Sequence, residues 1–194
     1  MTISAPVNNK HPFVLDISTT VASMGKVTRA ADLKQKLPET WALDVDGFPT
    51  TDPSKAILGS LLPIGNYKGF GLAISIEIIT ALLSGGPSAP HINSWIRQTH
   101  KSMGVSFTMI AIDISRFQKL DFFKRRMQEW IEIIINSPKK KGVERIYYSG
   151  EIEGETYDAR KISGIPVDNQ TIELFKSLAD RYKISHPTFK DNKS

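Results

Sequence analysis

Residues 61–86 read LLPIGNYKGFGLAISIEIITALLSGG, and the rest of the chain is arranged around this stretch. A turn-rich segment, residues 63–69, leads into a run in which Glu77 is the only charge. Apolar residues cover every face of a helix in that run, which predicts a helix buried inside the protein. The run is shorter than the ~20 apolar residues that a membrane span needs, and glycines at both ends fit a buried helix better.

Lys68 stands where this helix is predicted to begin. The first backbone N–H groups of a helix have no partner within the helix, and the helix dipole is positive at this end. A lysine there works against the dipole, so the position favours an anionic ligand such as a phosphate. From the residues alone, the chain is predicted to be an α/β domain that holds an anion at Lys68.

The composition is that of a globular protein, with 194 residues, 40% hydrophobic and 23% charged. This length fits one domain or a large part of a two-lobed protein. The formal charge of +5 comes largely from lysines 139–141 and the tail, and no basic patch with interleaved aromatics predicts nucleic-acid binding. A basic interaction module would rest on 139–141 alone, and a solvated loop after Pro138 explains that run equally well. The chain has no cysteine and no secretion signal, so a cytoplasmic protein without membrane or nucleic-acid partners is expected.

The pattern predicts a short buried strand at 12–18, two further strands at 105–114 and 143–148, and a polar loop at 1–10. Helices are predicted at 19–36, 121–136 and 153–161, with a last helix capped by Asp168 and a polar tail from 185. Asp16 lies in the first strand, where burying an unpaired carboxylate is costly. We therefore expect Asp16 to have a hydrogen-bond partner or a ligand, and Glu77 to have a structural partner.

Several metal-site and nucleotide-binding motifs are only partly matched by the sequence. Asp44 and Asp46 resemble part of a calcium loop, but the twelfth position holds Lys55 where an EF-hand needs glutamate, which favours a structural turn. Gly69-Phe70-Gly71 lacks the third glycine and the preceding strand of a Rossmann turn. The four histidines, at 11, 91, 100 and 186, have no partner at i, i+4 that would predict a metal site.

Three segments together resemble the malate/L-lactate dehydrogenase family. They are PFVLDISTT at 12–20 with Gly25-Lys26, then DGFPTTDP at 46–53 followed by LPIGNYKGFGL at 62–72, and finally Ser149-Gly150-Glu151 before Gly164-Ile165-Pro166. Their order and spacing follow the family pattern across nearly the whole chain.

The resemblance implies an α+β fold, a mainly antiparallel mixed sheet flanked by helices, unlike the Rossmann fold. Residues 1–184 would be the C-terminal portion of that fold and 185–194 a polar tail. The implied activity is hydride transfer between NAD or NADP and a 2-hydroxy acid or 2-keto acid, such as malate or lactate, in a homodimer. The cofactor-binding residues implied are Asp16, Ile17, Ser18, Tyr67, Lys68, Gly150, Glu151 and Ile152.

Two departures from the family pattern matter. Asn66-Tyr67-Lys68 stands where the family commonly has Gly-His-Lys. The family's proton-donating histidine and substrate-binding arginine lie in an N-terminal half, which we expect to precede the strand at Pro12 and to be absent here. Hydride transfer needs a positioned acid, so the chain alone should be catalytically poor. It is then a fragment or split-gene product that needs its N-terminal half, or a truncated relic that only binds a nucleotide or dimerises. Trp95, Arg97 and His100 face either the substrate or the surface.

Overall fold

The chain begins with a β-hairpin. In the computed structural model, which describes residues 1–94, 98 and 100–190, strand β1 (Thr2–Ala5) pairs antiparallel with β2 (Phe13–Asp16), with Thr2 opposite Asp16 and Ala5 opposite Phe13. A strand within the predicted range 12–18 is thus confirmed, but it spans only Phe13–Asp16 and is half-buried, not buried as predicted. The predicted loop at 1–10 is wrong at Thr2–Ala5, which form β1. The Val14 N–H donates to the Ser149 carbonyl at 2.9 Å, which fastens the segment before Gly150 to the hairpin.

A small helical core follows the hairpin. Helix α1 (Met24–Asp32) packs beside α2 (Pro53–Leu58), and β3 (Ala42–Leu43) pairs antiparallel with β4 (Ser60–Leu61). α1 begins later than the predicted position 19 because Ser23 is its N-cap, accepting a hydrogen bond from the Lys26 N–H at 3.3 Å. The buried residues of this core are Val27, Leu37, Ala42 and Ala56.

The aspartate-rich loop between β3 and α2 is a structural turn. One carboxylate oxygen of Asp44, Oδ1, accepts the backbone N–H groups of Asp46 and Phe48, both at 3.0 Å. Asp52 then caps α2, accepting the Ser54 N–H at 2.8 Å. Short polar side chains close such turns and caps by bonding backbone N–H groups that lack a partner within the helix.

Removing the Asp52 cap should destabilise this core. We expect Asp52→Ala to lower the free energy of unfolding by about 1 kcal/mol, because an N-terminal N–H of α2 loses its acceptor. The measurement is the midpoint of urea denaturation. Asp46→Ala is the matched control, since Asp46 is exposed in the same loop and contributes its backbone N–H, which alanine keeps. Equal midpoints for the two variants would contradict the capping role.

The central apolar stretch is helical, as predicted, but it is not buried. Helix α3 (Tyr67–Glu77) continues as a π-helical turn, η1 (Ile78–Leu82). Phe70 is 60% exposed and Leu83 is 77% exposed, and only Gly69 and Ala81 are buried along the two elements. The prediction of burial is wrong for this chain because the described residues do not cover the helix on every side. Glu77 is structural, since its carboxylate accepts the Ala89 N–H at 2.8 Å.

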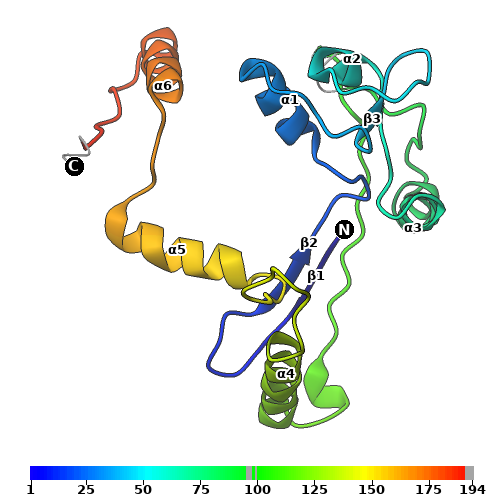
Figure 1. The fold of residues 1–194 in the computed structure, drawn as a ribbon, viewed down its shortest axis with the longest axis vertical. Helices are drawn as coiled ribbons and strands as arrows, with labels where there is room; N and C mark the ends of the chain where they lie inside the picture. Colours follow the sequence, from blue (N-terminus) through cyan, green and yellow to red (C-terminus); the bar gives the residue numbers. More distant parts are fainter. Residues whose placement is uncertain (95–97, 99, 191–194) are drawn as a thin grey trace. The chain divides into compact units, whose positions relative to one another are not determined.

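Two predicted strands do not form. In the described part of the chain, residues 105–114 and 143–148 do not pair with any strand. Figure 1 shows the first of these two segments as a long green trace that leads to η2 (Ile114–Arg116). A strand exists only when a neighbouring strand supplies its ladder hydrogen bonds. The predictions of strands at 105–114 and 143–148 are therefore wrong for the described structure, in which neither segment has a paired neighbour.

Helix α4 (Leu120–Ile135) matches the predicted amphipathic helix at 121–136. Ile131 is fully buried, but Phe122 and Trp130, both predicted on the inner face, are about half exposed. Just before α4, the Ser115 hydroxyl and N–H donate to Asp113 at 2.6 and 3.0 Å. These hydrogen bonds, the hydroxyl first, lower the pKa of the Asp113 carboxyl.

The chain divides into two compact units, Met1–Ser149 and Gly150–Ser194. The second unit holds α5 (Glu151–Ser163) and α6 (Asn169–Tyr182). Asp168 caps α6 as predicted, accepting the Thr171 N–H at 2.8 Å. The following segment returns to α6, where Phe189 stacks on Phe175 with ring centroids 6.4 Å apart. Among the described residues, no helix has the length and apolar character that crossing a membrane requires.

Candidate functional site

A cavity of about 320 Å³ opens at the end of β2, where three predicted cofactor-binding residues lie together. Asp16, Ile17 and Ser18 all line it. The other lining residues come from the turn after β2, from the start of α1 and from the segment before α3, and they are Thr20, Val21, Ala22, Ser23, Lys26 and Ile64. The first of the three predicted cofactor-binding segments therefore lines a cavity.

The polar groups of this segment face solvent. Asp16 is exposed, not buried as predicted, and its Oδ1 accepts a hydrogen bond from the Thr2 hydroxyl at 2.7 Å. The reason is the position of Asp16 at the open end of the hairpin, opposite Thr2, the first residue of β1, where the carboxylate is open to water. The Ser18 hydroxyl lies 3.0 Å from that of Thr20. A carboxylate and a hydroxyl at a strand end can exchange hydrogen bonds with ribose or amide groups.

The second predicted pair, Tyr67 and Lys68, begins α3 and is exposed. The turn before it has positive φ at Gly65 (57°) and at Asn66 (55°), and the Asn66 side chain makes no capping hydrogen bond. The first turn of α3 contains no acidic residue. The Lys68 N–H donates to the Gly65 carbonyl at 3.2 Å, and an anion at this helix start stays a prediction from the position of Lys68.

Ile64 joins the start of α3 to the cavity. The Ile64 N–H donates to the Thr19 carbonyl at 2.9 Å, and Ile64 itself lines the cavity. Gly69, buried in the first turn of α3, packs directly against the Ile64 backbone. Although Tyr67 and Lys68 are not among the described residues that line the cavity, the helix that carries them is fixed to its rim.

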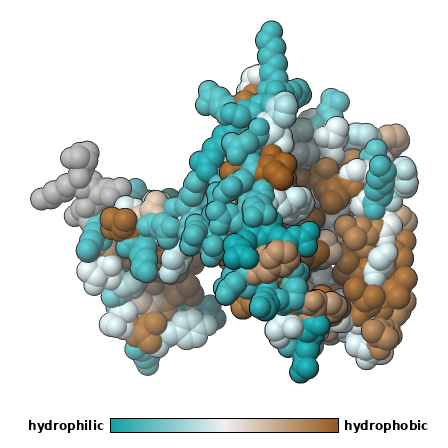
Figure 2. Space-filling model, turned by 90° about the horizontal axis from the view of Figure 1, so that it is seen from below, coloured by the Kyte–Doolittle hydropathy of each residue, from teal (hydrophilic) through white to brown (hydrophobic). Residues whose placement is uncertain are grey.

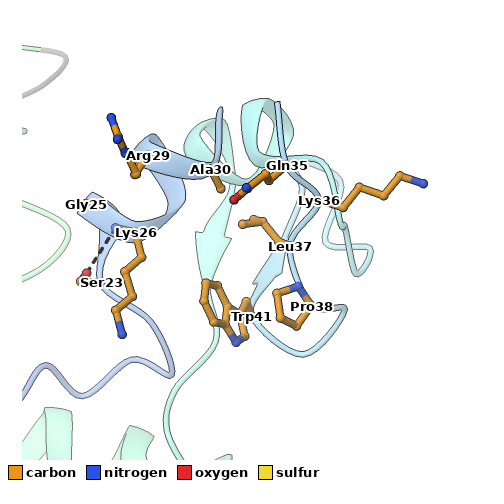
Figure 3. Close-up of a pocket in the computed structure, with 10 residues that line it drawn as sticks. All are labelled: Ser23, Gly25, Lys26, Arg29, Ala30, Gln35, Lys36, Leu37, Pro38 and Trp41. Carbon is orange, nitrogen blue, oxygen red and sulfur yellow. Dashed lines mark hydrogen bonds between the residues drawn. The ribbon is translucent and has the colours of Figure 1, made fainter. Parts of the chain in front are cut away.

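A second cavity, of about 460 Å³, adjoins the first, and Ser23 and Lys26 line both cavities. Figure 3 shows the side chains of Lys26 and Trp41 extending toward the same space from opposite sides, whereas Arg29 and Lys36 point away. Sequence reasoning included Lys26 only as part of the Gly25-Lys26 motif and assigned it no role. Lys26 therefore lines both neighbouring cavities, which suits a ligand that extends from one cavity to the other.

The third predicted segment belongs to the second unit. Gly150 has a φ of 94° and precedes α5, whose first residue, Glu151, is buried. Ile152 lines a cavity of about 510 Å³ within that unit, together with Glu153, Thr156, Tyr157, Arg160, Lys161 and Ile165. Glycine is favoured at position 150 because any residue with a Cβ atom would be strained in this left-handed backbone conformation. Gly150, Glu151 and Ile152 thus form one local group, at the start of a helix.

The sequence profile that describes malate/L-lactate dehydrogenase matches residues 1–176 of this chain. The chain belongs to the malate/L-lactate dehydrogenase family. This family assignment confirms the resemblance that the three sequence segments indicated. Its matched range includes all eight predicted cofactor-binding residues in both units.

Individual family members give the same relationship. Malate dehydrogenase of Pyrococcus abyssi is 33% identical over 187 residues, covering 92% of this chain and 51% of that protein. Ureidoglycolate dehydrogenase (NAD(+)) of Escherichia coli K12 is 26% identical, covering 97% and 53%. The crystal structure of malate dehydrogenase from Entamoeba histolytica superposes with a TM-score of 0.88 at 25% identity, covering 96% of this chain and 55% of that one. The chain spans about half the length of the curated relatives that it matches.

Groups suited to acid–base chemistry are scattered in this family member. His11 contributes its carbonyl, which accepts the Tyr148 hydroxyl at 3.0 Å, and His186 lies 2.7 Å from Asp180 within the second unit. His91 and His100 are exposed. Trp95 and Arg97, the other candidates for facing the substrate, lie outside the described residues. Within 1–94, 98 and 100–190, no group of three potential metal ligands occurs.

The lysine run at 139–141 is part of a loop. All three lysines are exposed, and Lys139 Nζ donates to the Glu144 carbonyl at 2.8 Å. The hydrogen bond from Lys139 agrees with the interpretation of this run as part of a solvated loop.

Proposed function

We propose that this chain supplies the nicotinamide-binding half of an oxidoreductase that transfers a hydride between NAD or NADP and a 2-hydroxy acid, such as malate or lactate. The observation that carries the proposal is the cavity at the end of β2, lined by Asp16, Ile17 and Ser18 within the family match. The non-Rossmann character of the fold, the homodimer and a cytoplasmic location are parts of the same proposal.

The chemistry of the residues supports a dinucleotide. The Lys68 ammonium group and the positive end of the α3 dipole suit a pyrophosphate, because both favour negative charge. Asp16 and Ser18 suit ribose hydroxyls or the nicotinamide amide. Lys26 offers a further cation between the two cavities. The cofactor would supply the hydride, and these side chains would bind and orient it. We assign Gly150, Glu151 and Ile152 to the same task from the family pattern.

Cofactor binding tests the proposal without requiring turnover. We expect NADH or NADPH to bind the chain, and Lys68→Ala to weaken binding roughly tenfold through loss of a charge-assisted hydrogen bond. The measurement is fluorescence titration with each dinucleotide in turn. Lys140→Ala is the matched control, since Lys140 is an exposed loop lysine distant in sequence from the site. Equal affinity of the Lys68→Ala and Lys140→Ala variants would remove Lys68 from the site.

A second candidate function is a module that binds a nucleotide or dimerises without catalysis. It is favoured by the lining of the cavity at the end of β2, in which no histidine is found among the described residues. If this second candidate is correct, the chain binds a dinucleotide as before, but no hydride transfer occurs when the other half of a family enzyme is added.

A further inference from the structure

The second cavity, beside α1, combines an aromatic ring with positive charge. Figure 2 shows apolar side chains gathered on the side of the view where α3 lies in Figure 1, but an apolar surface alone does not specify the chemistry of a ligand. The second cavity is more specific, because Lys26, Arg29 and Lys36 line it and no carboxylate is found among the described residues of its lining. This charge favours an anionic ligand.

Trp41 gives the second cavity an apolar wall. The indole packs against the small core between α1 and α2, yet it is only partly buried and lines the cavity together with Leu37 and Pro38. Aromatic rings of this kind stack on the π-faces of nucleic-acid bases. The cavity, of about 460 Å³, has the size of a pocket for a small molecule. Its wall and its charge together suit a nucleotide.

Lys26 stands where the two cavities meet. Its side chain extends toward the same space as that of Trp41 (Figure 3), and it lines both cavities. Among the described residues, no carboxylate forms an ion pair with its ammonium group. The ammonium group is therefore available to a phosphate that lies between the two cavities.

The two cavities differ in the groups that they offer. The first contains the Asp16 carboxylate, which repels a phosphate and accepts hydrogen bonds from hydroxyl or amide groups. The second offers cations and the Trp41 ring. A dinucleotide that spans both cavities therefore has a preferred direction, with its adenine and the adjoining phosphate away from Asp16.

We infer that the second cavity binds the adenosine half of the dinucleotide, with the adenine ring on Trp41 and the adjoining phosphate at the Lys26 ammonium group. The nicotinamide half then lies in the first cavity, beside residues 16–18. The inference rests on the proposed function, because it takes a nicotinamide dinucleotide as the ligand, and it adds the direction in which that ligand binds.

Two lysines of the same small core provide matched substitutions. Lys55 is exposed on α2 and lines neither cavity, whereas Lys26 lines both. We expect Lys26→Met to weaken binding of NADH about tenfold, because one charge-assisted contact with a phosphate is lost, and Lys55→Met to leave it unchanged. The measurement is fluorescence titration of the full chain. Equal affinity of the two variants for NADH overturns the inference, and so does a loss that is confined to NADPH, since it places Lys26 at the extra phosphate of that cofactor.

Adenosine monophosphate tests the second cavity without the nicotinamide half. Isothermal titration calorimetry should show that it binds the full chain and that Lys26→Met weakens this binding by the same factor as for NADH. No binding of adenosine monophosphate, or binding that is equal in Lys26→Met and Lys55→Met, overturns the inference.

The Trp41 ring is tested by a pair of substitutions at one position. We expect Trp41→Leu to weaken binding of adenosine monophosphate roughly tenfold through loss of stacking, and Trp41→Phe to retain most of the affinity. Because Trp41 also packs on the core, urea denaturation of both variants checks that each is folded. Folded leucine and phenylalanine variants of equal affinity overturn the stacking, and Lys26→Met tests the cavity where the leucine variant does not fold.

The inference and the proposed function fail differently. If NADH binds the chain and Lys26→Met binds it equally well, dinucleotide binding stands and the second cavity is not the adenosine site. If adenosine monophosphate binds through Lys26 but neither NADH nor NADPH binds, the adenylate site stands and the proposed function is wrong. Titrations with the three nucleotides therefore separate the two.

Discussion

Replacing Gly69 with alanine should lower the free energy of unfolding by about 1–3 kcal/mol. A Cβ at position 69 would press directly on the Ile64 carbonyl oxygen and lie 2.8 Å from the Ile64 nitrogen. Both are backbone atoms, so the contact is relieved only by moving the start of α3 away from Ile64. Because Ile64 lines the cavity at the end of β2, the same movement should weaken binding of NADH or NADPH.

Gly71→Ala is the matched control for this prediction. Gly71 lies in the same helix, and a Cβ added there meets nothing within 4 Å. Alanine also favours a helix over glycine by up to about 1 kcal/mol. Gly71→Ala should therefore be neutral or stabilising, while Gly69→Ala destabilises. Urea denaturation and dinucleotide titration of both variants provide the measurement, and two variants with the same midpoint would show that the contact with Ile64 is unimportant.

Supplying the half of Pyrococcus abyssi malate dehydrogenase that this chain does not match should raise hydride transfer by at least about 100-fold over this chain alone. Positioned general acids contribute typically 10²–10⁴-fold, and we expect the proton donor and the substrate-binding arginine in that half. The measurement is the change in NADH or NADPH absorbance with malate, lactate and their keto acids, using the Pyrococcus abyssi half as the complement.

The complement alone and the complement with the Lys68→Ala chain are the controls. The increase should require this chain and should fall when Lys68 is replaced, because Lys68 belongs to the cofactor site in our proposal. An unchanged rate in the presence of the complement would favour the second candidate, a module without catalysis. A rate that is the same with Lys68→Ala would keep the activity and exclude Lys68 from it.

Features of the fold that depend on near neighbours in the sequence could be predicted from it. Asp44 and Asp168 illustrate this, because a side-chain carboxylate bonds backbone N–H groups only a few residues away. The helices α4 and α6 follow for the same reason, since an apolar stripe of period 3.6 lies within one segment. The strand β2 was predicted from its own apolar run at 12–18, whereas its partner β1 was predicted to be a loop.

Features that depend on distant partners could not be predicted. The apolar run at 105–114 predicted a strand that the structure does not contain, because the run itself carries no information about whether a partner strand is present. The prediction that Phe70 and Leu83 are buried was wrong for the same reason. Whether a side chain is buried depends on the residues that pack over it, and these can lie far away in the sequence. Asp16 was expected in a buried strand from its apolar neighbours, but it lies at the open end of the hairpin, opposite Thr2, and is exposed. Of the candidate site, the grouping of Asp16, Ile17 and Ser18 followed from their adjacency, whereas the role of Lys26 required the geometry of two cavities.

The π-helical turn η1 changes how the central helix should be interpreted along its length. A π-turn uses more residues per turn than an α-helix, and each residue of an α-helix advances the side-chain direction by about 100°. Residues after Ile78 therefore do not continue the angular positions set by Tyr67–Glu77. A single helical wheel drawn through residues 67–83 assigns the later side chains to the wrong sides. Cross-links or substitutions designed on this helix need two wheels, with the second beginning at Ile78.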